Sequence, residues 1–435
     1  MSLEEAKLLK TFPSRFIHAY MQQYTYLIIG AGVAGTTAAE TIRSLDAAGS
    51  IALVGDEPYP FYSRIALSKE NYMLKRMTEE QIVWLKKESF YSDKNITYLK
   101  GVTATGLDAT KKQVPLSNGE ILQYDKLLLA VGGTPRRWSL PGSDKKGIYY
   151  LRTLDDARAV MAEFETLKEG LLIGGGFITF ELCDIMIKRG MKPTVMLREP
   201  YYWANLLDEE SGRMIEDVLK KSGVDIFYEE EVVEVLGDDH VDAAKTNKGR
   251  KFPTHFVSVG IGIIDRIGPF KSSGLATKKG ILTDAYMHTS LEDVWAAGDC
   301  AQYHDVILGE QVQLGNWANA MMHGRTAAMN MAGKKTEYRT LSAYTTQGLG
   351  MAICFVGDVF VTPDKEVIKR GSRQSGKYTR LLVKNNRIIG ATQLNMTLEL
   401  PWISKLITDQ RDISALKEKL ADPAQDLRTL ASRQL

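Results

Sequence analysis

Three glycines at fixed spacing, Gly30, Gly32 and Gly35, separate an apolar run from a stretch of helical periodicity. In a strand–turn–helix unit the first glycine makes a tight turn, the second lets a pyrophosphate approach the backbone, and the third lets helix and strand pack closely. Free N–H groups at the start of the helix, near Ala31 and Ala34, would point at the phosphates. The pattern predicts a dinucleotide-binding turn, with an ordinary βα turn as the alternative.

Two acidic residues, Asp56 and Glu57, follow the next predicted strand about twenty residues further on, where a ribose hydroxyl would be bound. They open a segment, 56–70, in which two prolines break regular structure. Arg64 and Lys69 lie in this loop. A solvated loop is one interpretation, but a loop that leaves a dinucleotide-binding strand passes close to the bound cofactor, so both cations are candidate binding residues.

A second group of candidates follows two further predicted strands. The buried strand 127–131 ends at a turn beginning with Gly132, and ligands of open α/β sheets bind at such strand ends. Gly298 and Asp299 follow another apolar strand, where a carboxylate could bind a sugar or polyol hydroxyl; an aspartate after a glycine is also a common turn residue. Trp317, on a predicted helix, is either a core residue or faces a ligand ring.

The glycine pattern recurs imperfectly later in the chain. Gly174 and Gly176 are present, but Thr179 stands where the third glycine is expected, and its Cβ should push helix and strand apart. The strand that follows ends in Leu197 where an acidic residue is typical, and Arg198 comes next. Arg198 could bind a 2′-phosphate, as in NADP sites, or be a surface charge next to an acidic neighbour.

These residues need parallel sheets and helices to position them. The first unit is predicted to combine a strand over 26–29 with a helix in which Ala38, Ile42 and Leu45 fall on one face. A short amphipathic helix is predicted over Leu3–Leu9. The fold class is therefore α/β, with two Rossmann-like domains and a C-terminal α+β domain.

The predicted domain boundaries follow from these motifs. They are an N-terminal arm (1–24), a discontinuous first dinucleotide domain (25–145 and 280–333), a second dinucleotide domain (146–279), and a C-terminal interface domain with a tail (334–435).

Composition narrows the functional class. Lys and Arg number 55 and Asp and Glu 53, so the net charge is 55 − 53 = +2, which gives no field for nucleic acid or membrane surfaces. No apolar run reaches the ~20 residues of a membrane span, and no secretory signal is expected. Cys183, Cys300 and Cys354 are far apart and form neither a CxxC pair nor a metal-ligand cluster. A cytoplasmic protein without a metal site is expected.

Taken in order, the motifs resemble the FAD-dependent pyridine nucleotide–disulfide oxidoreductase superfamily. The similarity is greatest to its branch without an active-site disulfide, which contains ferredoxin, rubredoxin and putidaredoxin reductases and flavin subunits related to nitrite reductase. The matching segments are 30–35, 55–70, 124–136, 151–157, 174–181, 294–301 and 316–333.

The resemblance implies roles for the residues around the FAD. The first three glycines would hold its pyrophosphate, and Asp56 or Glu57 would be nearest its adenosine ribose. The segment from Ala130 to Gly132 would pass the cofactor, with Val131 in place of the usual threonine. Asp299 would bind the ribityl chain.

Near the flavin ring, the resemblance implies that Arg64 and Lys69 border the flavin. Lys69 would pair with Glu181 as the catalytic pair, and Trp317 would lie where nicotinamide stacks. Since Thr179 and Leu197 depart from the pattern of the nicotinamide domain, FAD binding is the stronger inference and NAD(P)H binding the weaker.

The expected reaction is hydride transfer from NAD(P)H to the flavin, followed by electron passage to an external acceptor protein or partner subunit. Two alternatives remain open: an NAD(P)H oxidase that reduces oxygen, and an electron-entry subunit whose second dinucleotide fold no longer uses nicotinamide. We consider a homodimer as one assembly.

Overall fold

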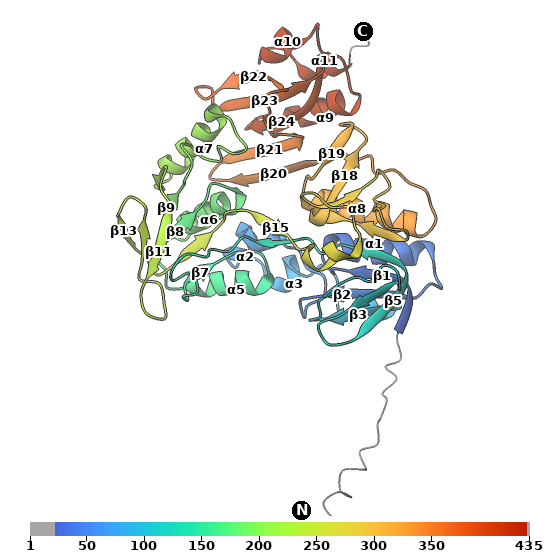
Figure 1. Cartoon of the computed structure of the whole chain (residues 1–435). Helices are drawn as coiled ribbons and strands as arrows, with labels where there is room; N and C mark the ends of the chain where they lie inside the picture. The colour runs from blue at the N-terminus through green and yellow to red at the C-terminus, as the bar shows by residue number, and fades with distance from the viewer. Residues whose placement is uncertain (1–21, 433–435) are drawn as a thin grey trace, which may run out of the picture.

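The computed structural model describes residues 22–432 and has three parts (Figure 1). The first dinucleotide fold (blue and orange) is at the lower right of Figure 1, the second (green) at the left, and the C-terminal sheet (orange to red) above both. The predicted helix over Leu3–Leu9 lies outside the described residues, as does the predicted arm up to residue 21. Residues 22–24, assigned to the arm, belong to the first strand.

The first fold is a parallel sheet built around the strand that precedes the glycine turn. Its strands are β1 (Gln22–Ile29), β2 (Ile51–Gly55), β3 (Ile96–Lys100), β5 (Ile121–Leu129) and β17 (Val294–Ala296), with β4 (Gln113–Pro115) antiparallel to β5. The strand order is β17-β5-β1-β2-β3. Residues 26–29 of β1 are all buried, as expected for an inner strand covered on both faces.

Two helices pack on one another beside this sheet. They are α1 (Val33–Leu45) and α8 (Trp317–Met331). A Cβ added at Gly324 would lie 2.1 Å from the carbonyl oxygen of Ala34, so the two backbones are in contact. Ala38 and Ile42 are buried, but Leu45 is 45% exposed. Leu45 is exposed because α1 ends there and the following loop is largely exposed.

Short elements connect β2 to β3 and carry the loop with the candidate cations. They are the 3-10 turn η1 (Ile65–Ser68), α2 (Glu70–Met73), α3 (Glu79–Ile82) and α4 (Ser89–Asp93). After β17 the chain forms η3 (Gly298–Cys300) and a small sheet of β16 (Ile281–Thr283), β18 (Ala301–Asp305) and β19 (Glu310–Val312).

The second fold repeats the same plan. Its parallel sheet contains β7 (Ile148–Tyr149), β8 (Glu169–Ile173), β9 (Lys192–Met196), β10 (Asp225–Phe227) and β14 (Val257–Val259). The strand order is β10-β9-β8-β14-β7. Its helices are α5 (Leu154–Glu163), α6 (Phe177–Lys188) and α7 (Glu209–Lys221), and its outer antiparallel sheet is β11 (Val232–Leu236), β12 (Ala243–Thr246) and β13 (Lys251–Pro253).

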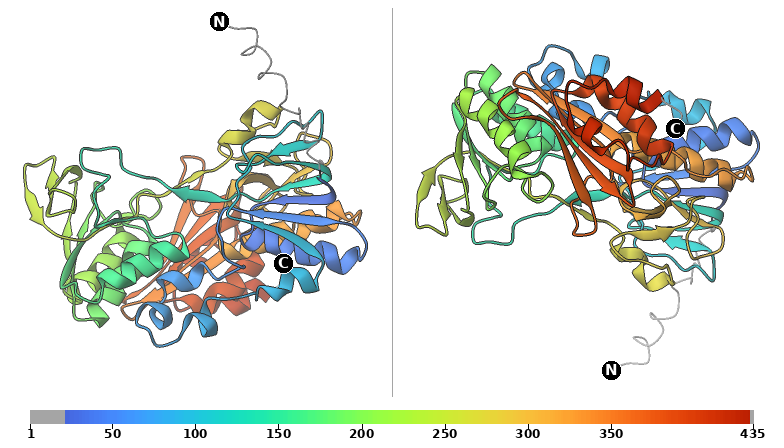
Figure 2. Two further views of the ribbon diagram at one scale, coloured as in Figure 1. Left: turned by 90° about the horizontal axis from the view of Figure 1, so that it is seen from below. Right: turned by 90° about the horizontal axis from the view of Figure 1, so that it is seen from above.

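Two antiparallel strands link the first and second folds. They are β6 (Gly133–Pro135) and β15 (Ile263–Asp265), and the short turn η2 (Gly268–Ser273) follows. Figure 2 shows the two folds on opposite sides of the molecule, with the C-terminal strands between them.

The C-terminal part is an antiparallel sheet covered by short helices. Its strands, in the order β20-β21-β24-β23-β22, are β20 (Ala343–Gly348), β21 (Met351–Gly357), β22 (Glu366–Ser372), β23 (Lys377–Lys384) and β24 (Arg387–Leu394). The helical elements are η4 (Thr397–Glu399), α9 (Leu400–Thr408), α10 (Lys417–Ala421) and α11 (Leu427–Ser432). The predicted α/β fold class with two Rossmann-like domains and a C-terminal α+β domain is confirmed.

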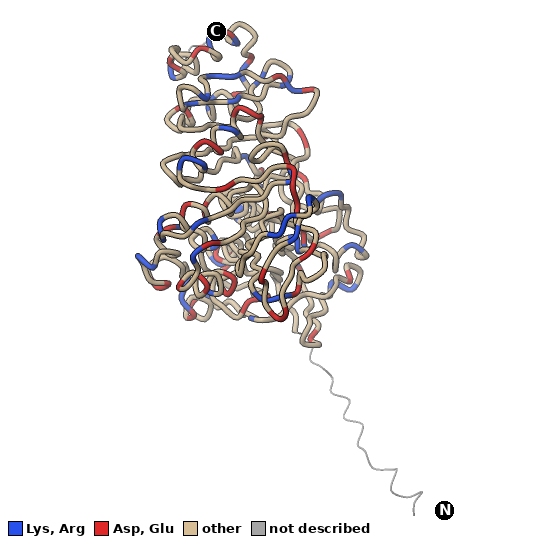
Figure 3. Tube along the Cα trace, turned by 90° about the vertical axis from the view of Figure 1, so that its left-hand side faces the viewer, with Lys and Arg blue, Asp and Glu red and all other residues tan. Residues whose placement is uncertain are grey.

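Charges of both signs alternate over the molecule, in keeping with the small net charge (Figure 3). Within residues 22–432, no helix is both long and apolar enough to cross a membrane.

Candidate functional site

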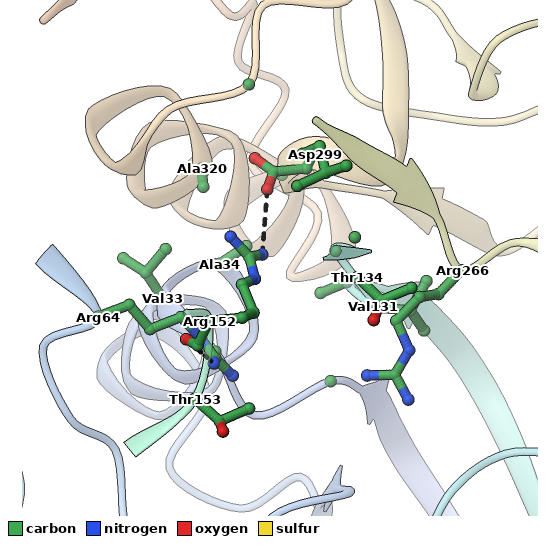
Figure 4. Close-up of a pocket in the computed structure, with 18 of the residues that line it drawn as sticks. Val33, Ala34, Arg64, Val131, Thr134, Arg152, Thr153, Arg266, Asp299 and Ala320 are labelled. Carbon is green, nitrogen blue, oxygen red and sulfur yellow. Dashed lines mark hydrogen bonds and ion pairs between the residues drawn. The ribbon is translucent and has the colours of Figure 1, made fainter. Parts of the chain in front are cut away.

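A cavity of about 1220 Å³ lies where the three parts of the fold meet, and part of its lining is drawn in Figure 4. Most of the residues predicted for the site line it, namely Gly30, Ala31, Gly32, Ala34, Asp56, Glu57, Arg64, Lys69, Ala130, Val131, Gly132, Glu181, Gly298, Asp299 and Trp317. Four predicted residues are not part of this lining: Gly35, Gly174, Gly176 and Arg198. The cavity therefore gathers the candidates from the first glycine turn but not those from the second.

The first glycine turn has the geometry that its spacing predicts. Gly30 has φ +111°, and a Cβ there would lie 2.2 Å from the carbonyl oxygen of Ala130. A Cβ at Gly35 would lie 1.8 Å from the carbonyl oxygen of Gly30. A Cβ at Gly32, by contrast, would meet no atom of residues 22–432 within 4 Å. The fold thus requires glycine at positions 30 and 35. Gly32 instead leaves open space at the start of α1, and this space fits a pyrophosphate.

The acidic residues after β2 are both engaged with arginines. Asp56 Oδ2 is 2.5 Å from Arg266 Nη1, and Glu57 forms an ion pair with Arg64. Glu57 also accepts a hydrogen bond from Tyr62 Oη at 2.5 Å. Asp56 and Glu57 both line the cavity, so the choice between them as the ribose ligand stays open. Arg266 lies 210 residues from Asp56, and no local sequence pattern indicates this pair.

Asp299 lies in η3, just after β17, and lines the cavity. Its Oδ2 is 3.3 Å from Arg152 Nη2 (Figure 4). A Cβ at Gly315 would lie 2.9 Å from Asp299 Oδ1. The backbone at Gly315 therefore passes close to this carboxylate, and the absence of a side chain there leaves room for it. Arg152 precedes α5, in the segment 151–157 that carries part of the family resemblance, yet sequence reasoning did not select it as a site residue.

A buried histidine supports the turn that carries Asp299. His323, on α8, is 1% exposed, and its Nδ1 accepts a hydrogen bond from the N–H of Gly298 at 3.4 Å. The rings of Tyr303 and Tyr338 each have centroids 4.4 Å from the imidazole. Burial lowers the pKa of His323 to about 3, because the charged imidazolium would lose its hydration. His323 is therefore neutral at physiological pH and holds the backbone next to Asp299.

The structure brings Lys69 and Glu181 together, as the resemblance implied. Lys69 Nζ is 2.5 Å from Glu181 Oε1. Lys69 comes from the loop before α2 and Glu181 from α6, so the pair joins the first and second folds across 112 residues. The Glu181 side chain is 8% exposed and that of Lys69 33% exposed, so the lysine is the partner that faces the cavity more openly. The catalytic role of the pair stays a prediction.

Trp317 begins α8 and is only partly buried. Its ring stacks on Phe61 with centroids 5.7 Å apart and an interplanar angle of 14°. Trp317 thus packs on a protein ring and also lines the cavity. Its proximity to nicotinamide stays a prediction.

At the second glycine turn, protein side chains pack closely around Thr179 and Gly176. Gly174 has φ +95°, as at the first turn, and Thr179 is buried at 3% exposure. A Cβ at Gly260 would lie 3.3 Å from Thr179 Oγ1, so a glycine on the facing segment makes room for the threonine. Tyr202 Oη donates to the carbonyl oxygen of Gly176 at 2.9 Å. The loop after β9 therefore packs on this turn.

The strand end that normally carries an acid is apolar and buried here. Leu197 is 1% exposed. Arg198 points into solvent with a side chain 72% exposed, and its Nε is 2.8 Å from Glu199 Oε1. The interpretation of Arg198 as a surface charge therefore fits this geometry better than that of a preformed phosphate ligand.

Most of the chain matches two known protein families. Residues 24–324 match the family described as pyridine nucleotide-disulphide oxidoreductase, and residues 349–431 match the reductase C-terminal family. The chain belongs to the pyridine nucleotide-disulphide oxidoreductase family. As predicted, this oxidoreductase is an FAD-dependent enzyme with NAD(P)H as its electron donor.

Individual relatives place the oxidoreductase among electron-transfer flavoproteins. The ferredoxin–NAD(+) reductase component of the biphenyl dioxygenase system of Paraburkholderia xenovorans is 30% identical over 407 residues, 93% of this chain and 98% of that protein. Nitrite reductase [NAD(P)H] of Bacillus subtilis is 29% identical over 391 residues, 89% of this chain but 48% of that protein. The chain thus spans about half the length of the latter relative.

Among solved structures, the covalent complex of putidaredoxin reductase with putidaredoxin matches with a TM-score of 0.87 and 26% identity, covering 95% of this chain and 99% of that chain. The match includes the C-terminal sheet as well as both dinucleotide folds.

Despite the family name, no cysteine is among the residues that line the cavity. All three cysteines, which fall in the described part of the chain, are free and buried. Burial raises the pKa of Cys300 to about 11 and also raises the pKa values of Cys183 and Cys354. Their thiols therefore stay protonated near neutral pH, and a protonated thiol is a poor nucleophile.

Replacing Cys183, Cys300 and Cys354 together by alanine is expected to leave NAD(P)H-dependent dye reduction unchanged, because no step uses a thiolate. Steady-state turnover at equal flavin content measures this. If turnover is lost while FAD stays bound, and the single Cys300→Ala variant reproduces the loss, a redox-active thiol operates after all.

Proposed function

We propose that this oxidoreductase transfers electrons from NAD(P)H through FAD to a one-electron protein acceptor of the ferredoxin or rubredoxin kind. The observation that carries the proposal is the composition of the cavity, whose lining comes from both dinucleotide folds and the C-terminal sheet and contains no cysteine. A disulfide substrate would have no thiolate to attack it, so electrons must leave to an external acceptor. The names of the ferredoxin and putidaredoxin reductases similar to this chain support the same acceptor class.

The first glycine turn and its surroundings would hold the FAD. The space at Gly32 and the N-terminus of α1 suit the pyrophosphate, Asp56 or Glu57 the adenosine ribose, and Asp299 the ribityl hydroxyls. Arg152, which contacts Asp299, is a further cation suited to the phosphates. When bound, the flavin accepts a hydride from the nicotinamide and releases electrons singly.

The protein's own contribution at the ring would be electrostatic. Lys69 lines the cavity with its ammonium paired to Glu181. A cation held beside a cofactor that gains negative charge stabilises the reduced form, and its effect is strongest where water is excluded. We therefore assign Lys69 and Glu181 as the catalytic pair.

Anaerobic stopped-flow mixing with NADH and NADPH tests the proposal. Bleaching of the flavin by at least one donor, followed by reoxidation with a ferredoxin or rubredoxin, is the expected result. Rapid reoxidation by oxygen alone, with peroxide as the product, would identify the oxidase instead. Absence of bleaching with both donors would support the electron-entry subunit.

Arg198 is expected to contribute little to donor choice. Its side chain lies in solvent and is already paired with Glu199, so contact with a 2′-phosphate must compete with a neighbouring carboxylate. Arg198→Ala should lower the NADPH-to-NADH ratio of kcat/KM by about threefold, since exposed ion pairs contribute up to about 1 kcal/mol. A loss of more than about a hundredfold would show that the pair with Glu199 breaks when NADPH binds.

We further propose a cytoplasmic location, because three unpaired buried thiols suit a reducing compartment. The homodimer stays a prediction, and size-exclusion chromatography with light scattering tests it.

A further inference from the structure

The C-terminal sheet contributes a side chain to the Lys69–Glu181 pair. Thr346, on β20, is 4% exposed and lines the cavity. Its Oγ1 donates to Glu181 Oε1 at 2.6 Å and accepts from Lys69 Nζ at 3.2 Å. One hydroxyl therefore contacts both charged partners, although it lies 277 residues from Lys69 and 165 from Glu181.

The carboxylate of Glu181 is fully engaged in this arrangement. Oε2 accepts a hydrogen bond from Ser68 Oγ, and Oε1 accepts from Lys69 and Thr346. A buried carboxylate needs hydrogen-bond donors to replace its lost hydration. Because Thr346 donates to the same oxygen that binds Lys69, it shares that oxygen with the ammonium and limits where the ammonium can sit.

Close packing of β20 on α6 holds Thr346 in place. A Cβ at Gly348 would lie 3.1 Å from the ring of Phe180 and 3.3 Å from Cβ of Asp184, so the strand lies against the helix. The N–H of Leu349 donates to Asp184 Oδ1 at 2.9 Å. The hydroxyl is thus positioned by the sheet rather than by a mobile loop.

An aromatic cluster near the N-terminus of α6 also holds β20 against this helix. Phe177, in the first turn of α6, packs against Tyr344 and Phe355 of the C-terminal sheet, with centroids 5.2 and 5.5 Å apart. Tyr344 and Phe355 stack on each other at 5.1 Å. Such aromatic contacts are short-ranged and directional, so they hold β20 in register with α6.

We propose that Thr346 is a positioning residue that aims the Lys69 ammonium into the cavity. Among the described residues, Lys69 Nζ has two hydrogen-bond partners, Glu181 and Thr346, which leaves one N–H for the cavity. Without the hydroxyl, the ammonium is free to rotate onto the carboxylate and away from the cavity. This inference rests on the proposed function, in which Lys69 stabilises the reduced cofactor.

The balance of the reaction explains why the position of the ammonium matters. The hydride brings two electrons and one proton from the nicotinamide, which leaves as NAD(P)⁺, so the bound cofactor gains negative charge unless a second proton arrives. A fixed cation nearby stabilises that charge, and the effect falls as the distance increases.

Two substitutions separate the hydroxyl from the shape of the side chain. Thr346→Val replaces the hydroxyl by a methyl group of similar size, whereas Thr346→Ser keeps the hydroxyl. The first readout is the midpoint potential of the bound FAD, measured by reductive titration against a reference dye, which requires neither donor nor acceptor. Thr346→Val should lower the two-electron potential by about 30 mV, which is a tenfold shift in the ratio of reduced to oxidised cofactor.

The second readout is the rate constant of flavin bleaching by NADH or NADPH. Thr346→Val should lower it by roughly tenfold, because the ammonium loses the hydrogen bond that keeps it in position. Thr346→Ser should keep both the potential and the rate constant close to wild type. If the valine variant does not fold, Thr346→Ala, which adds no bulk, is expected to show the same shift in potential.

Two results would overturn the inference: a wild-type potential in both hydroxyl-free variants, or an equal shift in the serine and valine variants, which would show that packing alone matters. Failure of the proposed function is seen separately, as absence of bleaching in the wild-type protein. The potential comparison still decides the role of Thr346 in that case.

Discussion

Gly32→Val is expected to give a folded protein that carries no flavin. A Cβ at Gly32 would meet no protein atom within 4 Å, and its φ of −73° is accessible to valine. The new side chain therefore occupies only the space over the turn where the FAD pyrophosphate is expected. We expect FAD affinity to fall by about a hundredfold, since overpacking by the added isopropyl group costs up to about 3 kcal/mol. Titration of FAD into apoprotein measures the loss.

Gly176→Val is the matched control at the second turn, where an added Cβ also meets nothing within 4 Å. This variant should keep its flavin and lose affinity for the nicotinamide donor instead. Circular dichroism of both variants checks that the fold is intact. Full flavin absorbance in Gly32→Val would mean that the pyrophosphate does not cross this turn.

Acid is expected to destabilise the protein through His323. The folded state holds this histidine neutral, with a pKa of about 3, whereas in the unfolded chain its pKa is near the ordinary value of 6.5. Between these two values the unfolded state binds more protons, so the stability contribution is complete above pH 6.5 and is lost as the pH falls toward 3. The slope approaches about 1.4 kcal/mol per pH unit, which gives roughly 2 kcal/mol at pH 5.

His323→Gln provides the control, because a glutamine oxygen can still accept the hydrogen bond from Gly298 but does not titrate. Urea unfolding at pH 7.5 and pH 5 measures the difference in free energy of unfolding. The wild-type protein should lose about 2 kcal/mol more than the variant over this interval. Flavin release in the same pH range is also expected, since Gly298 adjoins Asp299. An equal loss in both proteins would contradict the assignment.

The sequence predicted the first glycine turn well because its determinants are local. Gly30 and Gly35 are needed where the backbone itself comes too close for a side chain, and such needs leave a pattern within a few residues. Asp299 and Lys69 were found for a similar reason, since each stands next to a recognisable strand end or loop. Helical periodicity placed Leu45 on one face with Ala38 and Ile42, but it did not show that the helix ends there and leaves Leu45 exposed.

The residues that were missed depend on contacts between distant segments. Arg266 reaches Asp56 across 210 residues, and Arg152 reaches Asp299 across 147. Thr346 is one of two adjacent threonines in an ordinary strand, and only the packing of β20 on α6 brings it to Glu181. The sequence also did not show how Thr179 fits at the second turn. The glycine that makes room for it, Gly260, follows a different strand.

The contact between α1 and α8 also has a consequence for biosynthesis. Gly324 lies against the backbone of Ala34, so the first fold cannot complete its core until the ribosome has released α8. The second fold, whose strands run from β7 to β14, is synthesised entirely before that point. We therefore expect the second fold to form while the nascent chain is still growing, with the incomplete first sheet exposed to chaperones until α8 has been synthesised.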